Sequence, residues 1–467
     1  MYRILFLGKG LLIKASALVS AYFELGRKES DIDPLNIEVF TLKGANALGT
    51  NFMLPFQNQY NTWANDSSYS SADLVATENQ TKVTITPTRD AIGHRANIPF
   101  TIILDKGETY SLRASSLLAA NHLCGSLVSS NKPIAVTLLE DSMQPENPWA
   151  SGIDMAGDQL VPVTSIGTEY IVATRPDFEY GERGRIFILT TQPNTNISIF
   201  DGGNIAMTLN ALNSGVTTNY LQPAMSKSSY IKSNRPIYVF QITGTPWGEL
   251  GGALVPPLNC LGSDAVSVVR STKKGFSLII VAKTKILDSF LVNGVPNHTF
   301  LSRRDFTEVT TTPAGEGYSV ACKSYNIVDF PVAAPIQISN GYDGEGYFHL
   351  GVTEAEGLTF SLGYFSNFSR CEVDSTILSI GKKPDNLDQV GLAIYPNPAT
   401  SHFSLLRISE SKKYKMIISN CHGQPLIERS IEDSSQVVNV EHLPKGFYKV
   451  EIIDEQGETR IQKLILE

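Results

Sequence analysis

The sequence predicts an all-β protein: tandem repeated β-sandwich-like units followed by a small C-terminal Ig-like β-sandwich. The first observation is a repeat, since the motif NKPI at residues 131–134 returns as NRPI at residues 234–237. A repeat of this length indicates that one structural unit is used several times. Secondly, short runs alternate between apolar and polar residues and end at turn residues, as strands do. Thirdly, only 18% of the residues are charged, whereas helices commonly use Glu and Lys.

Two further motifs follow in the same order in both copies. A Pro-Trp pair at residues 148–149 matches residues 246–247, and Leu-Val-Pro at residues 160–162 matches residues 254–256. The spacing between equivalent prolines and tryptophans falls along the chain from 103 to 98 to 94 residues. We interpret this steady decrease as shorter loops between equivalent strands.

Composition and charge limit the possible partners. The 467 residues suffice for about three or four domains of ~100–150 residues each. The net charge of −8 argues against a nucleic-acid partner, which needs a basic surface. No run approaches the ~18 apolar residues that a membrane-spanning helix needs. We therefore expect no nucleic acid and no transmembrane segment.

Cysteine and histidine spacing gives no metal or redox motif. The five cysteines lie far apart and the seven histidines are scattered, so neither zinc nor a redox pair is indicated. Cys322 and Cys371 flank the end of one unit and could form a disulfide in an oxidising compartment. The alternative is buried thiols that pack as small apolar side chains. We expect no cofactor and no metal.

Residues 1–45 align with the end of a repeat. Residues 14–21 match residues 232–239 at a constant spacing of 218. Lys9 and Lys14 interrupt the apolar run that a signal peptide needs, although a signal peptide in residues 1–25 is the alternative interpretation. We therefore expect residues 1–45 to be a partial preceding repeat, in a chain that lacks its natural beginning and its signal peptide.

Three units are then expected, at residues 46–165, 166–260 and 261–371. The first is predicted to hold strands at residues 73–78, 82–86, 99–104, 109–113, 126–129 and 134–139. The second is predicted to hold strands at residues 170–173, 186–190, 197–200, 216–221, 228–231 and 237–242. The third unit is less regular: residues 278–281 and 290–292 repeat the opening hairpin, and a strand at residues 318–320 follows. Terminal repeats commonly depart from the pattern.

Residues 372–391 are predicted to be a polar, Pro-containing linker to a separate module at residues 392–467. Seven strands are expected in this module, at residues 392–395, 404–406, 414–419, 425–429, 437–440, 446–453 and 459–466. That number suits a small sandwich.

The C-terminal module contains the motif YPNPA at residues 395–399, the segment LPKGFYKV at residues 443–450 and a final basic-apolar strand. With these motifs it resembles the type A C-terminal sorting domain of the type IX secretion system of Bacteroidota. The positions that match are Tyr395, Pro396, Asn397, Pro398, Gly423, Gly446, Tyr448 and Lys463. The resemblance implies export by the type IX machinery to the outer cell surface or the extracellular space. It also implies that the domain is cut off and that the mature part is released or anchored.

Residues 40–370 contain a series of short characteristic segments: GTNF at 49–52, GETY at 107–110, CGS at 124–126, KPIAV at 132–136 and DQLVP at 158–162. Through these segments, residues 40–370 resemble the IgGFc-binding-protein N-terminal-domain family of bacterial surface proteins and animal mucus proteins. An antibody ligand does not transfer automatically to a bacterial member of such a family.

Candidate ligand-binding residues come from the loop between the Pro-Ile strand and the Leu-Val-Pro segment. Trp149 and Trp247 both follow a proline there, and an exposed indole could contact a sugar or a protein groove. The alternative is that each ring closes the end of its own sandwich. Asp154 and Asp158 are interpreted as acids flanking the Trp149 loop, where they would either be solvated or contribute to a calcium site.

No catalytic motif is visible, neither a nucleophile elbow nor a phosphate-binding loop. We expect no catalytic residues and no enzyme. The favoured hypothesis is a secreted, adhesin-like rod that recognises host or matrix glycoproteins or glycans through its loops. The alternatives are a secreted hydrolase, either a peptidase or a glycosidase, which would need paired carboxylates or an activated nucleophile, and a purely structural matrix component.

Overall fold

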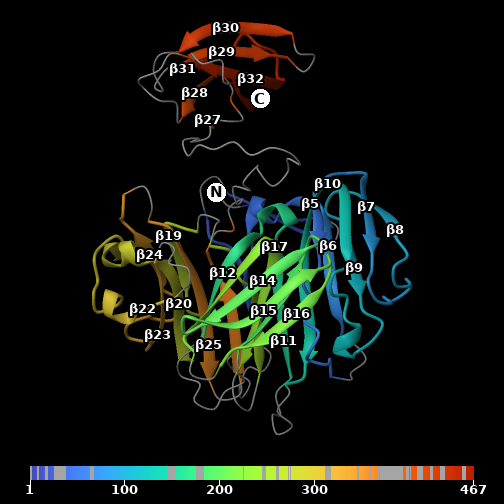
Figure 1. Ribbon diagram of the computed structural model, residues 1–467, viewed down its shortest axis with the longest axis vertical. Coiled ribbons are helices and arrows are strands. Elements are labelled where there is room, and N and C mark those ends of the chain that lie inside the picture. The colour runs from blue at the N-terminus through green and yellow to red at the C-terminus, as the bar shows by residue number, and fades with distance from the viewer. Residues whose placement is uncertain are drawn as a thin grey trace. The chain divides into compact units, whose positions relative to one another are not determined.

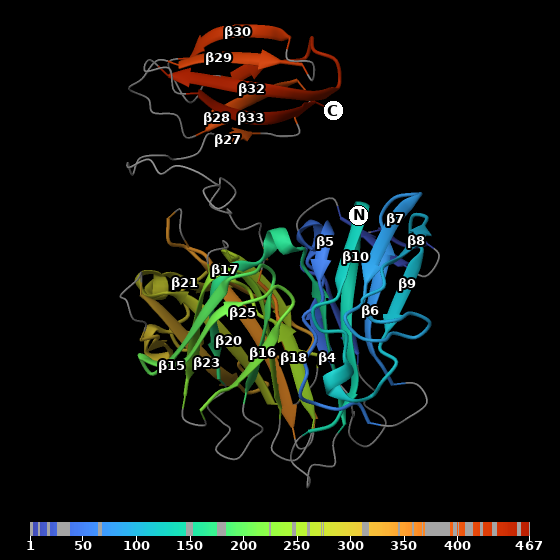
Figure 2. The same ribbon diagram turned by 45° about the vertical axis from the view of Figure 1, so that its right-hand side comes forward.

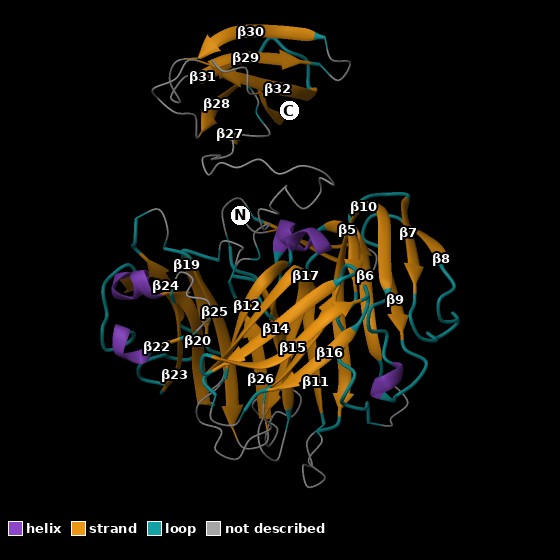
Figure 3. Cartoon of the chain, viewed as in Figure 1, coloured by secondary structure: helices purple, strands orange, loops and turns teal. Residues whose placement is uncertain are grey.

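The fold is described from a computed structural model (Figure 1). The described residues are 3–7, 10–15, 19–25, 38–63, 68–145, 153–174, 184–223, 226–244, 249–258, 262–271, 273, 275–310, 317–343, 346–356, 359–366, 368, 393–395, 399, 401–406, 414–420, 424–431, 437–454 and 459–466. The chain forms two compact bodies, residues 1–377 and residues 378–467. The larger body consists of strands and short 3₁₀ helices (Figure 3).

The first unit is built around one long strand. Its strands are β5 (Gly49–Met53), β6 (Ser70–Ala76), β7 (Thr81–Thr86), β8 (Phe100–Leu104), β9 (Thr109–Arg113), β10 (Leu127–Met143) and β11 (Asp154–Leu160), with the 3₁₀ helix η2 (Ala119–Asn121) before β10. The first part of β10 pairs with β5 and β7, and its second part pairs with β6 and β11. β10 therefore joins two groups of strands within one seven-stranded sheet.

The second unit repeats this arrangement strand for strand. It contains β12 (Gly167–Ala173), β13 (Arg185–Thr190), β14 (Thr195–Asp201), β15 (Asn204–Leu212), β16 (Thr217–Leu221), β17 (Ser228–Gly244) and β18 (Leu250–Leu254), after the 3₁₀ helix η3 (Val163–Ser165). The long strand β17 pairs first with β12 and β14, then with β13 and β18. The two seven-stranded sheets, one in each unit, confirm the predicted all-β, sandwich-like fold.

Two predictions about these strands were wrong. The predicted pairs at 126–129 and 134–139, and at 228–231 and 237–242, each form a single strand of 17 residues. Pro133 lies within β10, where the pairing with β5 shifts between Ser129 and Ile134. A residue without an N–H is tolerated at such a break in the ladder.

The third unit departs more from the pattern. One sheet holds β22 (Thr307–Glu308), β23 (Tyr318–Tyr325), β20 (Gly275–Lys283), β25 (Phe348–Glu356) and β26 (Thr359–Tyr364), in that order. A second sheet holds β19 (Ala265–Val269), β24 (Pro335–Asn340) and β21 (Phe290–Val292). The 3₁₀ helices η4 (Thr284–Ser289) and η5 (Arg303–Asp305) belong to the same unit. Because β20 and β21 lie in different sheets, the predicted opening hairpin is wrong.

The N-terminal residues add two hairpins, β1 (Arg3–Leu7) with β2 (Gly10–Lys14), and β3 (Tyr22–Leu25) with β4 (Glu38–Thr41). The 3₁₀ helix η1 (Gly44–Ala47) follows β4. Strand β4 packs against β11 and β26, and β18 packs against the same two strands. The four inner strands β4, β11, β18 and β26 thus form a ring, and Figure 2 shows β4 and β18 in the middle of the larger body.

The inner strands that form this ring are parallel to one another. A Cβ atom added at Gly252 would lie 3.0 Å from the Cβ of Ala156, and two residues further on Leu254 N donates to Asp158 Oδ2 over 2.8 Å. Between β18 and β26, Phe360 N donates to Glu249 and the added Cβ of Gly251 would lie 2.9 Å from Leu362 N. All four inner strands therefore begin at one end of the ring, which we call the inlet end.

Neighbouring units share apolar cores. One cluster joins Val136 and Leu160 of the first unit to Phe240 and Leu254 of the second. Another joins Val239 of the second unit to Phe360 and Leu362 of the third, and a further cluster lies within the third unit. The expected rod of separate sandwiches is therefore wrong, because the units close into one body around the inner strands.

The smaller body has the seven predicted strands. They are β27 (Ala393–Tyr395), β28 (His402–Leu406), β29 (Tyr414–Ser419), β30 (Pro425–Ile431), β31 (Val437–Asn439), β32 (Gly446–Asp454) and β33 (Thr459–Leu466). They form sheets of three and four strands over their own apolar core, which includes Phe403, Met416 and Val450. The predicted C-terminal sandwich is confirmed. In the described part of the chain, no helix has the length and apolar character needed to cross a membrane.

Candidate functional site

The two tryptophans singled out from the sequence, Trp149 and Trp247, lie outside the described residues. The strands on either side of them are described. The segment with Trp149 connects β10 to the first residue of β11, and the segment with Trp247 connects β17 to β18. Because β11 and β18 are parallel, the first residues of both strands lie at the inlet end.

An exposed tryptophan at this end was not singled out from the sequence. Trp63 is 48% exposed, and its backbone N donates to Ser142 O near the end of β10. Thr62 N donates to Leu117 O, which brings the segment with the 56% exposed Leu118 alongside. We call Asn61, Trp63 and Leu118 the Trp63 surface. Its only sequence signal is that Trp63 is one of just three tryptophans.

Backbone geometry fixes the Trp63 surface. Asn61 accepts hydrogen bonds from Ala119 N and Gln144 N, both over 2.9 Å. Ser142 has a φ of +52°, in a region that non-glycine residues seldom adopt, at a bulge in the pairing of β10 with β11. Bulges of this kind redirect a strand. The indole is therefore presented on an anchored segment of backbone.

The interpretation of Asp154 and Asp158 as loop acids is wrong. Both lie in β11 and are almost completely buried. Asp158 Oδ1 contacts Lys43 Nζ, and Asp158 Oδ2 accepts a hydrogen bond from Leu254 N. Within the described residues, no group of three or more His, Cys, Asp or Glu side chains is arranged to hold a metal ion.

Three buried carboxyl groups gather at the inlet end of the inner strands: Glu38, Asp154 and Glu249. Burial, and next the charge of Asp154, raises the pKa of Glu38 well above its usual value. Burial and the charge of Glu249 do the same for the pKa of Asp154. Glu38 Oε2 and Asp154 Oδ2 accept no hydrogen bond from the described residues. These surroundings therefore favour the protonated, neutral forms of Glu38 and Asp154.

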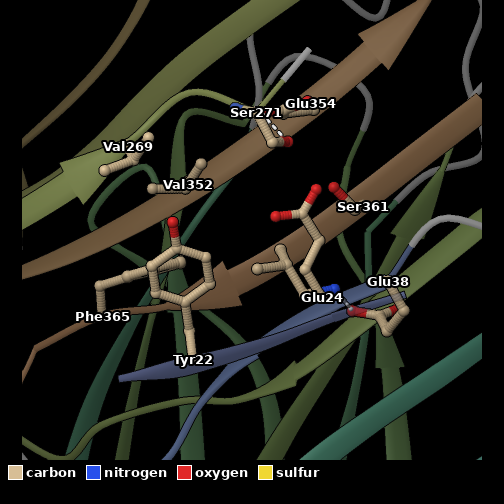
Figure 4. Close-up of a pocket in the computed structure, with 10 residues that line it drawn as sticks. Tyr22, Glu24, Glu38, Val269, Ser271, Val352, Glu354, Ser361 and Phe365 are labelled. Carbon is tan, nitrogen blue, oxygen red and sulfur yellow. Dashed lines mark hydrogen bonds between the residues drawn. The ribbon is translucent and has the colours of Figure 1, made fainter. Parts of the chain in front are cut away.

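A small cavity of about 20 Å³ lies beside Glu38, between the N-terminal hairpin and the third unit (Figure 4). Its polar lining includes Tyr22, Glu24 and Glu354, and Ser271 donates to Glu354 over 3.4 Å. Burial, followed by the charges of Glu24 and Glu354, raises the pKa of Tyr22. A cavity of this volume has room for about one water molecule, so it suits neither a peptide nor a sugar ring.

A second polar cluster lies inside the first unit. His122 Nδ1 lies 3.0 Å from Glu140 Oε2 and 3.2 Å from Gln57 Nε2, and all three side chains are buried. Burial opposes the charge on His122, but attraction to Glu140 and the hydrogen bond between them outweigh it, so the pKa of His122 is raised. Burial raises the pKa of nearby Cys124 to about 12. This cysteine therefore stays a thiol, which is a weak nucleophile.

The sorting-domain motif is only partly described. Tyr395 ends β27 and Lys463 lies in β33, where it pairs with Lys449. Gly446 begins β32 with a φ of +153°, and the Tyr448 hydroxyl donates to Pro444 O over 2.5 Å. Pro396, Asn397, Pro398 and Gly423 lie outside the described residues.

Comparison with known proteins identifies both parts of the chain. Residues 40–342 match the family described as IgGFc binding protein, and residues 393–467 match the one described as secretion system C-terminal sorting domain. No curated protein matches the chain. The crystal structure of trypsin-activated alpha-2-macroglobulin from Escherichia coli is 8% identical, with 98% of this chain and 44% of that chain covered and a TM-score of 0.14. A Salmonella alpha-2-macroglobulin mutant gives the same identity and TM-score, with 98% of this chain and 42% of that chain covered. The chain thus spans less than half the length of these proteins.

Proposed function

Because the chain belongs to the IgGFc binding protein family and ends in a secretion system sorting domain, we propose that this secreted surface protein binds a host or matrix glycoprotein or glycan. The sorting domain supports interaction with the secretion machinery and export to the cell surface or beyond. In our proposal this domain is then removed, and residues 1–377 carry out the binding.

The inlet end is the proposed binding surface. One observation carries this choice: β11 and β18, the strands that follow Trp149 and Trp247 in the sequence, begin at the same end of the ring. The exposed Trp63 lies beside the end of β10, the strand that precedes Trp149 in the sequence. Aromatic side chains with a polar edge are favoured in both protein and sugar recognition because they bury a large area at low entropic cost.

We further propose that the protein acts by binding and not by catalysis. The cavity beside Glu38 has a volume of only about 20 Å³, which is too small for the substrate of a peptidase or a glycosidase. Burial holds Cys124 in its thiol form by raising its pKa to about 12. These features support the binding hypothesis over the hydrolase.

Binding of the secreted chain to immobilised IgG Fc and to mucin tests the proposal. We expect Trp63→Ala, and the double variant Trp149→Ala with Trp247→Ala, each to weaken binding to one of these probes at least tenfold. Tyr347→Ala is the matched control. Tyr347 is also exposed. It lies just before the start of β25, and because the last residues of β25 lie at the inlet end, Tyr347 is at the opposite end of this strand. Unchanged binding in all the tryptophan variants, or wild-type protein that binds neither probe, would contradict the proposal.

A further inference from the structure

Lys43 and Asp158 form a pair that is sealed from water. The side chains are 1% and 3% exposed, and Lys43 Nζ contacts Asp158 Oδ1 directly. The two residues lie 115 positions apart in the chain. Lys43 follows β4, and Asp158 is in the middle of β11. The contact therefore joins two of the four inner strands.

Groups from three further positions hold the pair in place. Gln159 Oε1 accepts a hydrogen bond from Lys43 N over 2.5 Å, which fixes the backbone that carries the amine. Lys43 Nζ lies 4.9 Å from the centre of the Phe368 ring, so an apolar surface covers it. Leu254 N of β18 donates to Asp158 Oδ2 over 2.8 Å. The amine and the carboxyl group thus meet in a fixed orientation.

We propose that Lys43 and Asp158 react to form an intramolecular amide bond between Nζ and Cγ. The neutral amine attacks Cγ of the neutral carboxylic acid, and the bond between Cγ and Oδ1 breaks. The leaving hydroxyl group takes one proton from Nζ and departs as water, while Oδ2 remains as the amide oxygen. The atoms balance without any oxidant, reductant or co-reactant.

The surroundings favour each part of this step. Burial lowers the pKa of Lys43 and raises the pKa of Asp158, although attraction between the two groups opposes both changes. Proton transfer from Nζ to the carboxylate then gives the neutral amine and acid, which a dry interior prefers to two charges. The Leu254 N–H is aimed at Oδ2, the atom on which negative charge develops during the attack. A fixed donor at that atom stabilises the transition state.

The product would link β4 covalently to β11. The position of β4 in the ring would then no longer depend on non-covalent contacts alone. This inference is independent of the proposed ligand, since it concerns the interior of residues 1–377.

Mass spectrometry of the intact secreted chain, reduced and denatured, tests the inference. We expect the measured mass to be lower, by the mass of one water molecule, than the mass calculated from the amino-acid sequence. After proteolysis we expect a branched peptide that joins the segments around Lys43 and Asp158. Wild-type protein with its full mass would overturn the proposal, since the pair would then be an ion pair only. This measurement needs no variant and does not depend on any ligand.

Two variants sharpen the test. Lys43→Arg keeps the positive charge but cannot form the amide, so we expect it to keep its full mass. In Asp158→Asn, Nζ would attack Cγ of the side-chain amide, and the NH₂ group would take one proton from Nζ and leave as ammonia. We expect the product to have the same mass as cross-linked wild-type protein. A folded Asp158→Asn chain that keeps its ammonia would contradict the proposed attack on Cγ.

The matched control is Lys323→Arg. Lys323 pairs with Asp305 over 3.0 Å, but these side chains are 26% and 23% exposed and keep access to water. We expect Lys323→Arg to leave the mass loss unchanged. A mass loss abolished by Lys323→Arg would assign the reaction to that pair and overturn our assignment.

Discussion

Strands β11 and β18 occupy equivalent places in the ring but differ in chemistry. Each follows a strand of 17 residues, pairs with its second part and starts at the inlet end. β11 reads DMAGDQL and buries two carboxyl groups, whereas β18 reads LGGAL and is wholly buried without a charge. The repeat therefore sets where an inner strand lies, while the way it holds its neighbours can change from unit to unit.

The two strands use different kinds of contact. β11 reaches β4 through the Lys43–Asp158 pair. β18 approaches β26 closely because Gly251 has no side chain: an added Cβ would lie 2.9 Å from both Leu362 N and the Phe360 ring. One junction thus depends on a polar pair and the other on the absence of a side chain.

Removing the carboxyl group on the β11 side should have the largest effect. Asp158→Ala leaves the Lys43 amine buried without its partner, so we expect the free energy of unfolding of residues 1–377 to fall by about 3–5 kcal/mol. Denaturant unfolding measures this. Glu78→Ala is the control, because Glu78 and Lys132 of the same body form a pair whose side chains are 54% and 34% exposed, and its loss should cost less than ~1 kcal/mol. Equal losses of unfolding free energy in the two variants would show that the buried pair contributes no more to stability than an exposed pair.

Adding a side chain on the β18 side should have the next largest effect. Gly251→Val must displace the backbone of Leu362, so we expect a loss of about 2–3 kcal/mol from overpacking. Gly341→Ala serves as the control, since the nearest atom to an added Cβ there is 3.5 Å away. Denaturant unfolding again gives the comparison. If Gly251→Val were as stable as Gly341→Ala, close approach of β18 and β26 would not matter.

The smallest effect should come from the acids at the inlet end, and it depends on pH. The raised pKa of Glu38 means that its protonated form is favoured in the folded state. Its contribution to stability is therefore complete below the pKa of an unfolded glutamate, about 4.3, and is lost as the pH rises towards the folded value.

In Glu38→Gln the side chain keeps the size and shape of a protonated glutamate but cannot lose a proton. We expect the variant to gain on the order of 1 kcal/mol over the wild type as the pH is raised from 5 to 8. Thermal unfolding at the two pH values measures this difference between the two proteins, and Glu24→Gln, at a more exposed position of the same cavity, is the control. The same gain in the control, or none in Glu38→Gln, would contradict the assignment.

The sequence was sufficient to predict most of the outer strands. In the C-terminal body all seven expected strands are present, because alternating residues such as Tyr414, Met416 and Ile418 face one core. In the first two units, β6 to β9, β12 to β14 and β16 lie at nearly the expected residues, whereas β5, β11, β15 and β18 were not expected. This part of the fold follows from local pattern.

The ring could not be predicted in the same way. β18 is short and contains two glycines, which have low strand propensity, and β11 contains two aspartates that suggested a loop. Asp158 is buried only because Lys43 lies opposite, and the sequence does not reveal that contact. The position of Trp63 similarly depends on backbone hydrogen bonds to residues 117 and 142. Each of these missed features depends on contacts with residues that are distant in the sequence.

The place of β4 in the ring also governs the order in which the chain can mature. The Thr41 hydroxyl donates to Tyr364 O over 2.7 Å, across 323 positions of sequence. A ribosome must therefore complete almost the whole larger body before this early strand finds its final neighbour, and contacts at such separation form slowly. Until β26 has been made, β4 lacks one of its two neighbours in the ring.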